Sequence, residues 1–268
     1  MSWFWRTVWS CASGFSAYPP LARASRQELW RYLLLLTLIS SAVLSVVVMR
    51  EFRARMQELV AFVQQLPTIA ITDGAATLEA PQPVRLERRD VAGIGDLLIV
   101  ADTTGQTQTL EHPAGFGVFL TAHDVTIRQG ARLRRYSLQS IPRLTIDDAF
   151  IADWGRRLTR WCYGVAPLVM FVSGLGARLM QALFWSAIAW AVRRVTGRPL
   201  AFPVVWRVAV FALGPPVLFA TLVETLVMGH THPLLWFMYM TIYLVLFNGA
   251  LAVTAHALED KTAVGSRQ

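Results

Sequence analysis

Apolar residues in this chain gather in long runs that are separated by one long polar segment. A helix needs about 20 apolar residues to cross the roughly 30 Å hydrocarbon core of a bilayer. The runs have this length, and they lie at residues 32–49, about 161–192, about 208–228 and about 234–256. The pattern therefore predicts an α+β membrane protein with four transmembrane helices. The last three should form a bundle over 161–256, and residues 50–160 form one domain inserted between helices 1 and 2.

The inserted segment 50–160 changes its periodicity along the chain. Apolar residues recur at helical spacing over 51–66, up to Pro67, and 147–160 is helical again, which predicts two helical stalks. Between them, short β-branched stretches alternate with Asp-Gly and Thr-Gly turns, which is typical of hairpins. We expect a β-rich core over 67–146 with roughly five to seven strands. The clearest stretches are 69–71, 97–100, 118–120, 125–127 and 133–138.

The net charge of +8 is distributed unevenly along the chain. Residues 1–31, 193–207 and 257–268 hold ten Lys or Arg against three Asp or Glu, whereas 50–160 is nearly balanced at fourteen against thirteen. Lys and Arg concentrate in short cytoplasmic segments of membrane proteins. The sequence thus predicts a multi-pass protein of the bacterial inner membrane, with both termini cytoplasmic and 50–160 outside. Nucleic-acid binding is not favoured, because it needs a basic patch on a folded surface.

The two ends of the chain carry different patterns. Residues 1–31 begin with aromatic side chains around Arg6, which predicts an amphipathic cytoplasmic helix at the membrane surface, ended by Tyr18-Pro19-Pro20. Residues 257–268 are polar and are expected to form a disordered cytoplasmic tail. Cys11 and Cys162 would lie on opposite faces of the membrane, so no disulfide is expected.

The β-rich segment contains three short motifs. They are Leu66-Pro67 with Ile71 and Asp73-Gly74, then Asp102-Thr103-Thr104-Gly105 after Ile99-Val100-Ala101, and Gly117-Val118-Phe119-Leu120-Thr121. With these motifs the chain, from about Phe15 to the last span, resembles an uncharacterised bacterial membrane-protein family of unknown function. That family is typified by the Gram-positive maltodextrin-utilisation protein. The resemblance implies an extracytoplasmic β-rich domain and carboxy-terminal spans similar to Yip-type membrane domains, but no catalytic residue. A composition of 24 Arg and one Lys departs from the Gram-positive members and suggests another kind of bacterium.

Candidate catalytic and metal-binding groups are few. The sequence lacks a P-loop, a dinucleotide-binding glycine pattern, H-E-x-x-H and G-x-S-x-G, so we predict no enzyme activity and no cofactor. Asp73 before Gly74 and Asp102 before Gly105 could act as a general acid and base. The favoured interpretation is that both are turn residues, because aspartate accepts hydrogen bonds from nearby backbone amides.

Histidines offer a second candidate for metal binding. His230 and His232, with His112 or His123, could in principle hold Zn²⁺, but no cysteine or carboxylate cluster joins them. A solvated polar loop is favoured, and no metal site is predicted.

Polar residues inside the apolar runs are the sharper signal. Arg178, Glu224 and Asn248 form a candidate intramembrane polar site, since an unpaired charge there costs several kcal/mol. A direct Arg178–Glu224 pair is not favoured, because Arg178 would lie about 25 Å along a span that starts near Trp161. A helix break near Gly174–Gly176 would instead let Arg178 line a wet cavity. Pro215 and Pro216 should kink the third span and free backbone carbonyls.

Three classes of function follow from these patterns. The first is a non-enzymatic envelope component that binds or scaffolds through its outer β-rich domain. Its partners would be the lipid bilayer and either an envelope protein or a second copy of the chain. The alternative is a transport or lipid-handling component that uses the kinked carboxy-terminal bundle, although the same polar groups could simply hold the helices together. A membrane enzyme is third, because no nucleophile or metal constellation is present.

Overall fold

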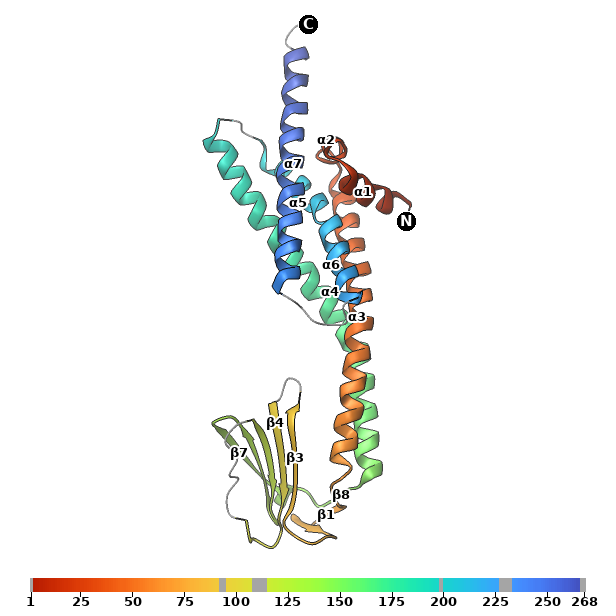
Figure 1. Ribbon diagram of the computed structural model, residues 1–268, viewed down its shortest axis with the longest axis vertical. Coiled ribbons are helices and arrows are strands. Elements are labelled where there is room, and N and C mark those ends of the chain that lie inside the picture. Colours follow the sequence, from red (N-terminus) through yellow and green to blue (C-terminus); the bar gives the residue numbers. More distant parts are fainter. Residues whose placement is uncertain (1, 92–94, 108–114, 198–199, 227–232, 266–268) are drawn as a thin grey trace. The chain divides into compact units, whose positions relative to one another are not determined.

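The computed structural model describes residues 2–91, 95–107, 115–197, 200–226 and 233–265 (Figure 1). The chain divides into two compact units. The helical unit comprises Met1–Glu51 and Cys162–Gln268, and the β-rich unit comprises Phe52–Trp161. The predicted α+β class is confirmed, since both helices and β-sheets are present.

The helical unit contains α1 to α7, of which α3 and α4 continue into the β-rich unit (Figure 1). Four helices are long and apolar enough to cross a membrane, as predicted: α3, α4, the α5–α6 pair and α7. The helices are α1 (Ser2–Ser13), α2 (Tyr18–Leu21), α3 (Arg26–Val63), α4 (Asp148–Val195), α5 (Phe202–Ala212), α6 (Gly214–Leu226) and α7 (Pro233–Gly265).

Local sequence explains where the long helices begin. Ser25 and Glu28 form a capping box at the start of α3, in which each side chain accepts a hydrogen bond from the other residue's backbone N–H, at 3.2 and 2.8 Å. At α4, the Asp147 carboxylate accepts from the Phe150 N–H at 2.7 Å. The backbone of 257–265 continues α7, which differs from the disordered tail expected there. Extending an existing helix through residues such as Ala and Lys avoids the cost of nucleation.

The third apolar run is divided at Leu213, between α5 and α6. The carbonyl of Phe211 would ordinarily accept from residue 215, but Pro215 has no N–H. The Tyr32 hydroxyl donates to this carbonyl instead, at 3.1 Å, and the Tyr32 and Phe211 rings lie 4.8 Å apart. A Cβ at position 214 would overlap the Tyr32 hydroxyl, so the position requires glycine. The side chain of α3 thereby compensates for the break in the proline-containing helix.

The amino-terminal helix α1 packs its narrow apolar face on this same region. Phe4 and Cys11 are buried, and the Phe4 ring lies 5.5 Å from the Tyr32 ring. Trp9, in contrast, is 75% exposed. The apolar face of α1 is therefore covered by protein, whereas the sequence predicted only an amphipathic helix at a membrane surface. Burial raises the pKa of the Cys11 thiol to about 12, so this thiol is unreactive near neutral pH.

The β-rich unit holds two sheets (Figure 1). The three-stranded sheet is antiparallel, in the order β2-β1-β8. The five-stranded sheet has the order β3-β4-β5-β6-β7, with β4 and β5 parallel and the other pairs antiparallel. The strands are β1 (Ile69–Thr72), β2 (Ala75–Leu78), β3 (Val84–Val91), β4 (Gly95–Ala101), β5 (Phe116–Leu120), β6 (Asp124–Gln129), β7 (Arg132–Ser137) and β8 (Arg143–Ile146).

The eight strands among the described residues exceed the five to seven expected. The strand with the weakest sequence signal is β3, whose sequence VRLERRDV places Arg88 where alternation calls for an apolar residue. Arg88 forms an ion pair of 2.8 Å with Glu58 of α3, and its guanidinium lies 5.9 Å from the centre of the Phe62 ring. The charged side chain thus covers an aromatic ring, as long arginine stems do. Only the tertiary contact makes this position favourable.

The two sheets share a small core. Ile69 and Ile71 of one sheet pack with Ala101 and Leu120 of the other, beside Leu138. In the same unit, the end of α3 lies against the start of α4, where a Cβ at Gly155 would meet Val60 at 2.6 Å. The core of the β-rich unit is therefore built from strand ends that the turn motifs position.

Candidate functional site

A cavity of about 490 Å³ lies among α3, α4, α6 and α7 in the helical unit. This volume falls within the range of small-molecule sites in proteins, about 300–1,000 Å³. Its apolar walls include Leu44, Val217 and Leu235, and its polar lining residues are Arg178, Gln181, Thr221, Glu224 and Tyr239. We refer to it as the Arg178 cavity.

Small residues let α3 and α4 approach each other beside this cavity. A Cβ at Gly174 would lie 3.4 Å from the Ser41 hydroxyl and 3.7 Å from Arg178 Nη1. The Ser41 hydroxyl donates to the Met170 carbonyl at 3.3 Å. Close contacts of this kind are typical of helix packing within membranes. Gly174 lies inside the continuous helix α4, so the break considered near Gly174–Gly176 does not occur.

The Arg178 guanidinium has one neutral partner. Its Nη2 donates to the Ser40 hydroxyl at 2.6 Å, and that hydroxyl in turn donates to the Leu36 carbonyl at 2.7 Å. Its Nη1 is buried and has no hydrogen-bond partner among the described residues. Arginine stays charged in proteins, so this positive charge is held without a counter-ion in an apolar setting.

Glu224 lines the same cavity but does not neutralise Arg178. No carboxylate oxygen of Glu224 lies within 4.0 Å of an Arg178 nitrogen. The Tyr239 hydroxyl, also in the cavity wall, donates to Gln181 Oε1 at 2.7 Å. The cavity therefore contains one cation and one carboxylate that are not paired with each other.

Arg178 and Glu224 lie nearer each other than a second span that starts near Trp161 would imply. A span starting near Trp161 would put Arg178 far from Glu224, yet both line one cavity. The reason is the length of α4, whose 48 residues extend over about 72 Å, more than twice the thickness of a bilayer core. The part of α4 that contacts the apolar run of α3 is centred on 170–178, not on the start of the predicted span.

Asn248 does not belong to the Arg178 cavity. Its side chain donates to the Leu244 carbonyl at 2.8 Å and lines a separate groove with Trp185 and Arg193. Pro215 and Pro216 lie in the first turn of α6, directly after the break at Leu213. The structure therefore brings together two of the three predicted intramembrane polar residues.

In the β-rich unit, Asp73 and Gly74 form the two-residue turn of the β1–β2 hairpin. Both have positive φ, 49° and 77°, as a type I′ turn requires. Their N–H groups donate to Pro142 and Ile141. A Cβ at Gly74 would lie 2.7 Å from the Gln139 Cα. These contacts dock the hairpin on the segment before β8.

Asp102 is a second turn residue, and the residue as a whole is only 1% exposed. One oxygen accepts from the N–H and hydroxyl of Thr104 at 2.9 and 2.6 Å, and the other accepts from the Thr107 N–H at 2.5 Å. Burial alone would raise the pKa of this carboxyl, but the hydrogen bonds outweigh it and lower the pKa to about 2. Gly105 follows with a φ of 79°. No contact joins Asp102 to Asp73 among the described residues, so the geometry supplies no acid–base pair.

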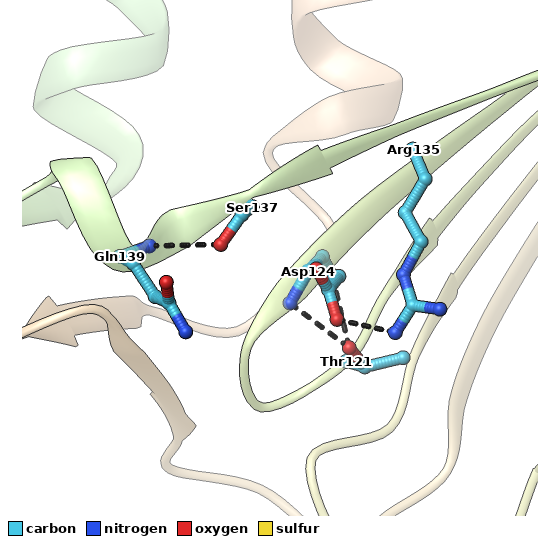
Figure 2. Close-up of polar contacts among 5 residues, drawn as sticks. All are labelled: Thr121, Asp124, Arg135, Ser137 and Gln139. Atoms are coloured by element: carbon cyan, nitrogen blue, oxygen red, sulfur yellow. Dashed lines mark hydrogen bonds and ion pairs between the residues drawn. The ribbon is translucent and has the colours of Figure 1, made fainter.

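A third cluster of polar side chains stabilises the turn between β5 and β6 (Figure 2). The Thr121 hydroxyl donates to the Asp124 carbonyl and accepts from the Asp124 N–H, at 3.0 and 3.1 Å. The Asp124 carboxylate accepts from Arg135 at 2.5 Å, which raises the pKa of Arg135. Nearby, the Ser137 hydroxyl accepts from the Gln139 N–H at 3.3 Å. Figure 2 shows these side chains bonded to one another and to turns, which is a structural role.

No group of three His, Cys, Asp or Glu that could hold a metal ion occurs within the described ranges. His112, His230 and His232, which the sequence singled out, lie outside the described residues. His123 lies in the turn before β6, where its carbonyl accepts from the Leu138 N–H at 2.8 Å. Cys11 is buried and Cys162 partly buried, and both are free.

Fold and site together define an α+β protein with four helices of membrane-spanning length and an arginine-lined cavity among them. Residues 5–250 match a family described as "Protein of unknown function (DUF1189)", and the chain belongs to this family. No curated protein and no solved structure matches it. The predicted membership of an uncharacterised family is confirmed. Its typification by the maltodextrin-utilisation protein and the similarity to Yip-type domains stay predictions.

Sequence reasoning missed several residues of the cavity. Gln181 and Tyr239 of the lining were not singled out, nor was Ser40, which accepts from Arg178. Each is a polar residue within an apolar run. Ser40 belongs to a set of small hydroxyl residues on α3, and such residues recur at helix interfaces in membranes. That set is Thr37, Ser40, Ser41 and Ser45, all of which are buried.

Proposed function

We propose that the helical unit binds the anionic headgroup of a lipid in the Arg178 cavity, and that the protein is a lipid-handling component of its membrane. The observation that carries this proposal is the guanidinium of Arg178, which lines the cavity with one hydrogen bond to Ser40 and, among the described residues, no carboxylate partner. At an effective dielectric constant of 20, an anion about 4 Å from this charge gains about 4 kcal/mol. A phosphate or carboxylate group in the cavity would supply the missing counter-ion.

The composition of the cavity supports a lipid over a wholly polar ligand. Apolar side chains form much of the wall, and Trp236 at its margin is 63% exposed. Hydrocarbon chains can therefore stay outside the unit, in the bilayer, while the polar headgroup enters. An intramembrane charge facing a cavity is typical of a functional site.

The experiment compares lipids that differ only in their headgroup charge. The full chain is purified in detergent, and native mass spectrometry measures how much added phosphatidylglycerol or diacylglycerol it retains. Wild type should retain about ten times more phosphatidylglycerol than diacylglycerol. Arg178→Gln should reduce this to the level of diacylglycerol, and Arg178→Lys should keep part of the preference.

Arg194→Gln is the matched control, because it removes one arginine charge from α4 outside the cavity lining. The control should retain phosphatidylglycerol like wild type. Equal retention of the two lipids by wild type, or an unchanged preference in Arg178→Gln, contradicts the proposal.

The proposed location is the bacterial inner membrane, with both termini in the cytoplasm and residues 50–160 outside it. The concentration of Lys and Arg in residues 1–31, 193–207 and 257–268 supports this orientation. A membrane-impermeant maleimide tests it on intact spheroplasts of a strain carrying the chain without Cys11 and Cys162. Glu79→Cys should be labelled from outside, and Thr196→Cys only after lysis. The reverse pattern would invert the proposed topology.

A second candidate function is binding of an acidic envelope protein through the β-rich unit. The observation that favours it is the edge strand β7, on which all six residues are exposed. Leu133 is 64% exposed there between Arg132 and Arg134. A photo-crosslinker in place of Tyr136 in the full chain tests this in cells. Crosslinking to an acidic protein that Leu133→Asp abolishes is the expected result, and crosslinks only between copies of the chain would count against it.

A further inference from the structure

Glu224 is the second charged residue that lines the Arg178 cavity in the described part of the chain. Within the described part of the chain it makes no hydrogen bond or ion pair, although its side chain is partly buried. A ligand with only a negative charge would neutralise Arg178 but would be repelled by Glu224. A cavity with one cation and one separated carboxylate is complementary to a ligand that carries both charges.

We infer that the ligand is a zwitterion with a primary ammonium group, in which the anion binds Arg178 and the ammonium binds Glu224, as in the headgroup of an aminophospholipid. The inference rests on the proposed lipid-binding function and names the headgroup that the cavity selects. A phosphoryl ethanolamine headgroup has both charges, joined by a two-carbon chain.

The cavity favours a primary ammonium over a quaternary one. A carboxylate is a hydrogen-bond acceptor, so Glu224 can accept from N–H groups that a trimethylated nitrogen does not have. Quaternary ammonium groups are instead recognised by cages of aromatic rings. Among the described lining residues only Trp236 and Tyr239 are aromatic, and the Tyr239 hydroxyl already donates to Gln181.

Gln181 reinforces this assignment because it does not compete for either charge. Its Oε1 accepts from Tyr239 at 2.7 Å, and its Nε2 lies 3.8 Å from the Met240 sulfur. The amide is thus held against α7. Arg178 and Glu224 are the two charged groups among the described lining residues, and the ligand is expected to bind both of them.

The test compares three phospholipids with the same acyl chains on the full chain in detergent, again by native mass spectrometry. Phosphatidylethanolamine has both charges and N–H donors, phosphatidylcholine has both charges without N–H donors, and phosphatidylglycerol has the negative charge alone. Wild type should retain phosphatidylethanolamine about tenfold better than either of the others. O-Phosphoethanolamine, which has the same headgroup without acyl chains, is added as a competitor to distinguish a lipid from a soluble zwitterion.

Variants of Glu224 separate the inference from the proposed function. Glu224→Gln should lower retention of phosphatidylethanolamine to the level of phosphatidylglycerol, and Glu224→Asp should keep the preference. Glu79→Gln is the control, because it removes an exposed carboxylate in the β-rich unit. The melting temperature of each variant shows whether it is folded.

Each outcome decides one point. Equal retention of all three phospholipids, with Arg178→Gln lowering all of them, overturns the zwitterion inference and leaves the proposed function standing. A preference for phosphatidylethanolamine that Glu224→Gln does not change also overturns it. Competition by O-phosphoethanolamine at the same concentration as the lipid overturns the lipid as the source of the headgroup. Failure of Arg178→Gln to alter any retention overturns the proposed function itself.

Discussion

The helical unit and the β-rich unit treat their buried polar groups in opposite ways. In the β-rich unit, the buried carboxylate of Asp102 accepts three hydrogen bonds from its own turn. The half-buried Arg88 is likewise paired, with the exposed Glu58. In the helical unit, four buried polar atoms lack a partner among the described residues, and the β-rich unit contributes none to this set. They belong to Arg178, Ser186, Tyr243 and Thr254.

The difference indicates which polar residues build structure and which are available for a ligand. A buried polar group without a partner costs free energy that packing must offset. Arg178 combines this cost with a full charge and a neighbouring cavity. The sharpest experiments therefore alter a paired group in one unit and an unpaired group in the other.

The largest effect on stability is expected at the helix break. Gly214→Ala would push a methyl group into the Tyr32 hydroxyl and displace its hydrogen bond to Phe211. Overpacking and the lost bond together should cost about 3 kcal/mol of unfolding free energy. Thermal unfolding of the full chain in detergent measures this. Gly176→Ala is the control, since nothing lies within 4 Å of a Cβ there. If Gly214→Ala had the same melting temperature as wild type, the break would not be tightly packed.

The next effect is expected at Asp102 in the β-rich unit. The pKa of its carboxyl falls from 3.8 to about 2 on folding, which corresponds to about 2 kcal/mol of stability. This contribution is present above about pH 4 and is lost as the pH falls through about 2. Asp102→Asn should lower the melting temperature near pH 7. The difference in melting temperature between this variant and wild type should become smaller in acid. Asp73→Asn is the control and should have little effect, because asparagine also tolerates positive φ. If the difference in melting temperature between Asp102→Asn and wild type did not depend on pH, the carboxylate of Asp102 would not stabilise the fold through its charge.

A matched pair of arginine substitutions, one in each unit, tests the difference between paired and unpaired polar groups directly. Arg88→Met removes an ion pair and a cation–π contact and should cost about 1 kcal/mol. Arg178→Met removes a charge that has no counter-ion among the described residues, and it should leave stability unchanged or raise it. Melting temperatures of the two variants in the full chain provide the measurement. Strong destabilisation by Arg178→Met would mean that this arginine holds the helices together.

The smallest effect is expected at the exposed Arg135–Asp124 pair (Figure 2). Arg135→Gln should leave the melting temperature unchanged within error, because solvent screens exposed ion pairs. Asp124→Ala should have the larger effect of the two if the backbone contacts with Thr121 fix the turn. Equal and large losses in both variants would show that this surface pair is structural.

The sequence was most informative where a local pattern is sufficient. A run of apolar residues has the length of a membrane helix whatever its neighbours are, and the four helices of this length are present. Asp73-Gly74 is a two-residue turn because positive φ is a property of those residues themselves. Strand β3 was not foreseen, because Arg88 is favourable only beside Glu58 and Phe62 of α3.

In the candidate site, too, the sequence reveals the single residues but not which of them lie together. Arg178 and Glu224 are visible in the sequence as charges in apolar runs, but their shared cavity depends on which part of α4 contacts α3. Counting from Trp161 does not give the position of Arg178 relative to Glu224, because α4 is much longer than a bilayer core. Asn248 has the same sequence signal, but its side chain donates to the Leu244 carbonyl of its own helix.

The sequence by itself determined the apolar helices, the uneven distribution of charge and the turns with positive φ, since each depends on residues that are close together in the chain. Only the tertiary structure decided the register of α4 against α3, the filling of the Gly214 break by Tyr32, and the absence of a partner for Arg178 among the described residues. The first two of these features join residues more than a hundred positions apart. Packing and hydrogen bonding between distant segments set them, and no local pattern encodes such contacts.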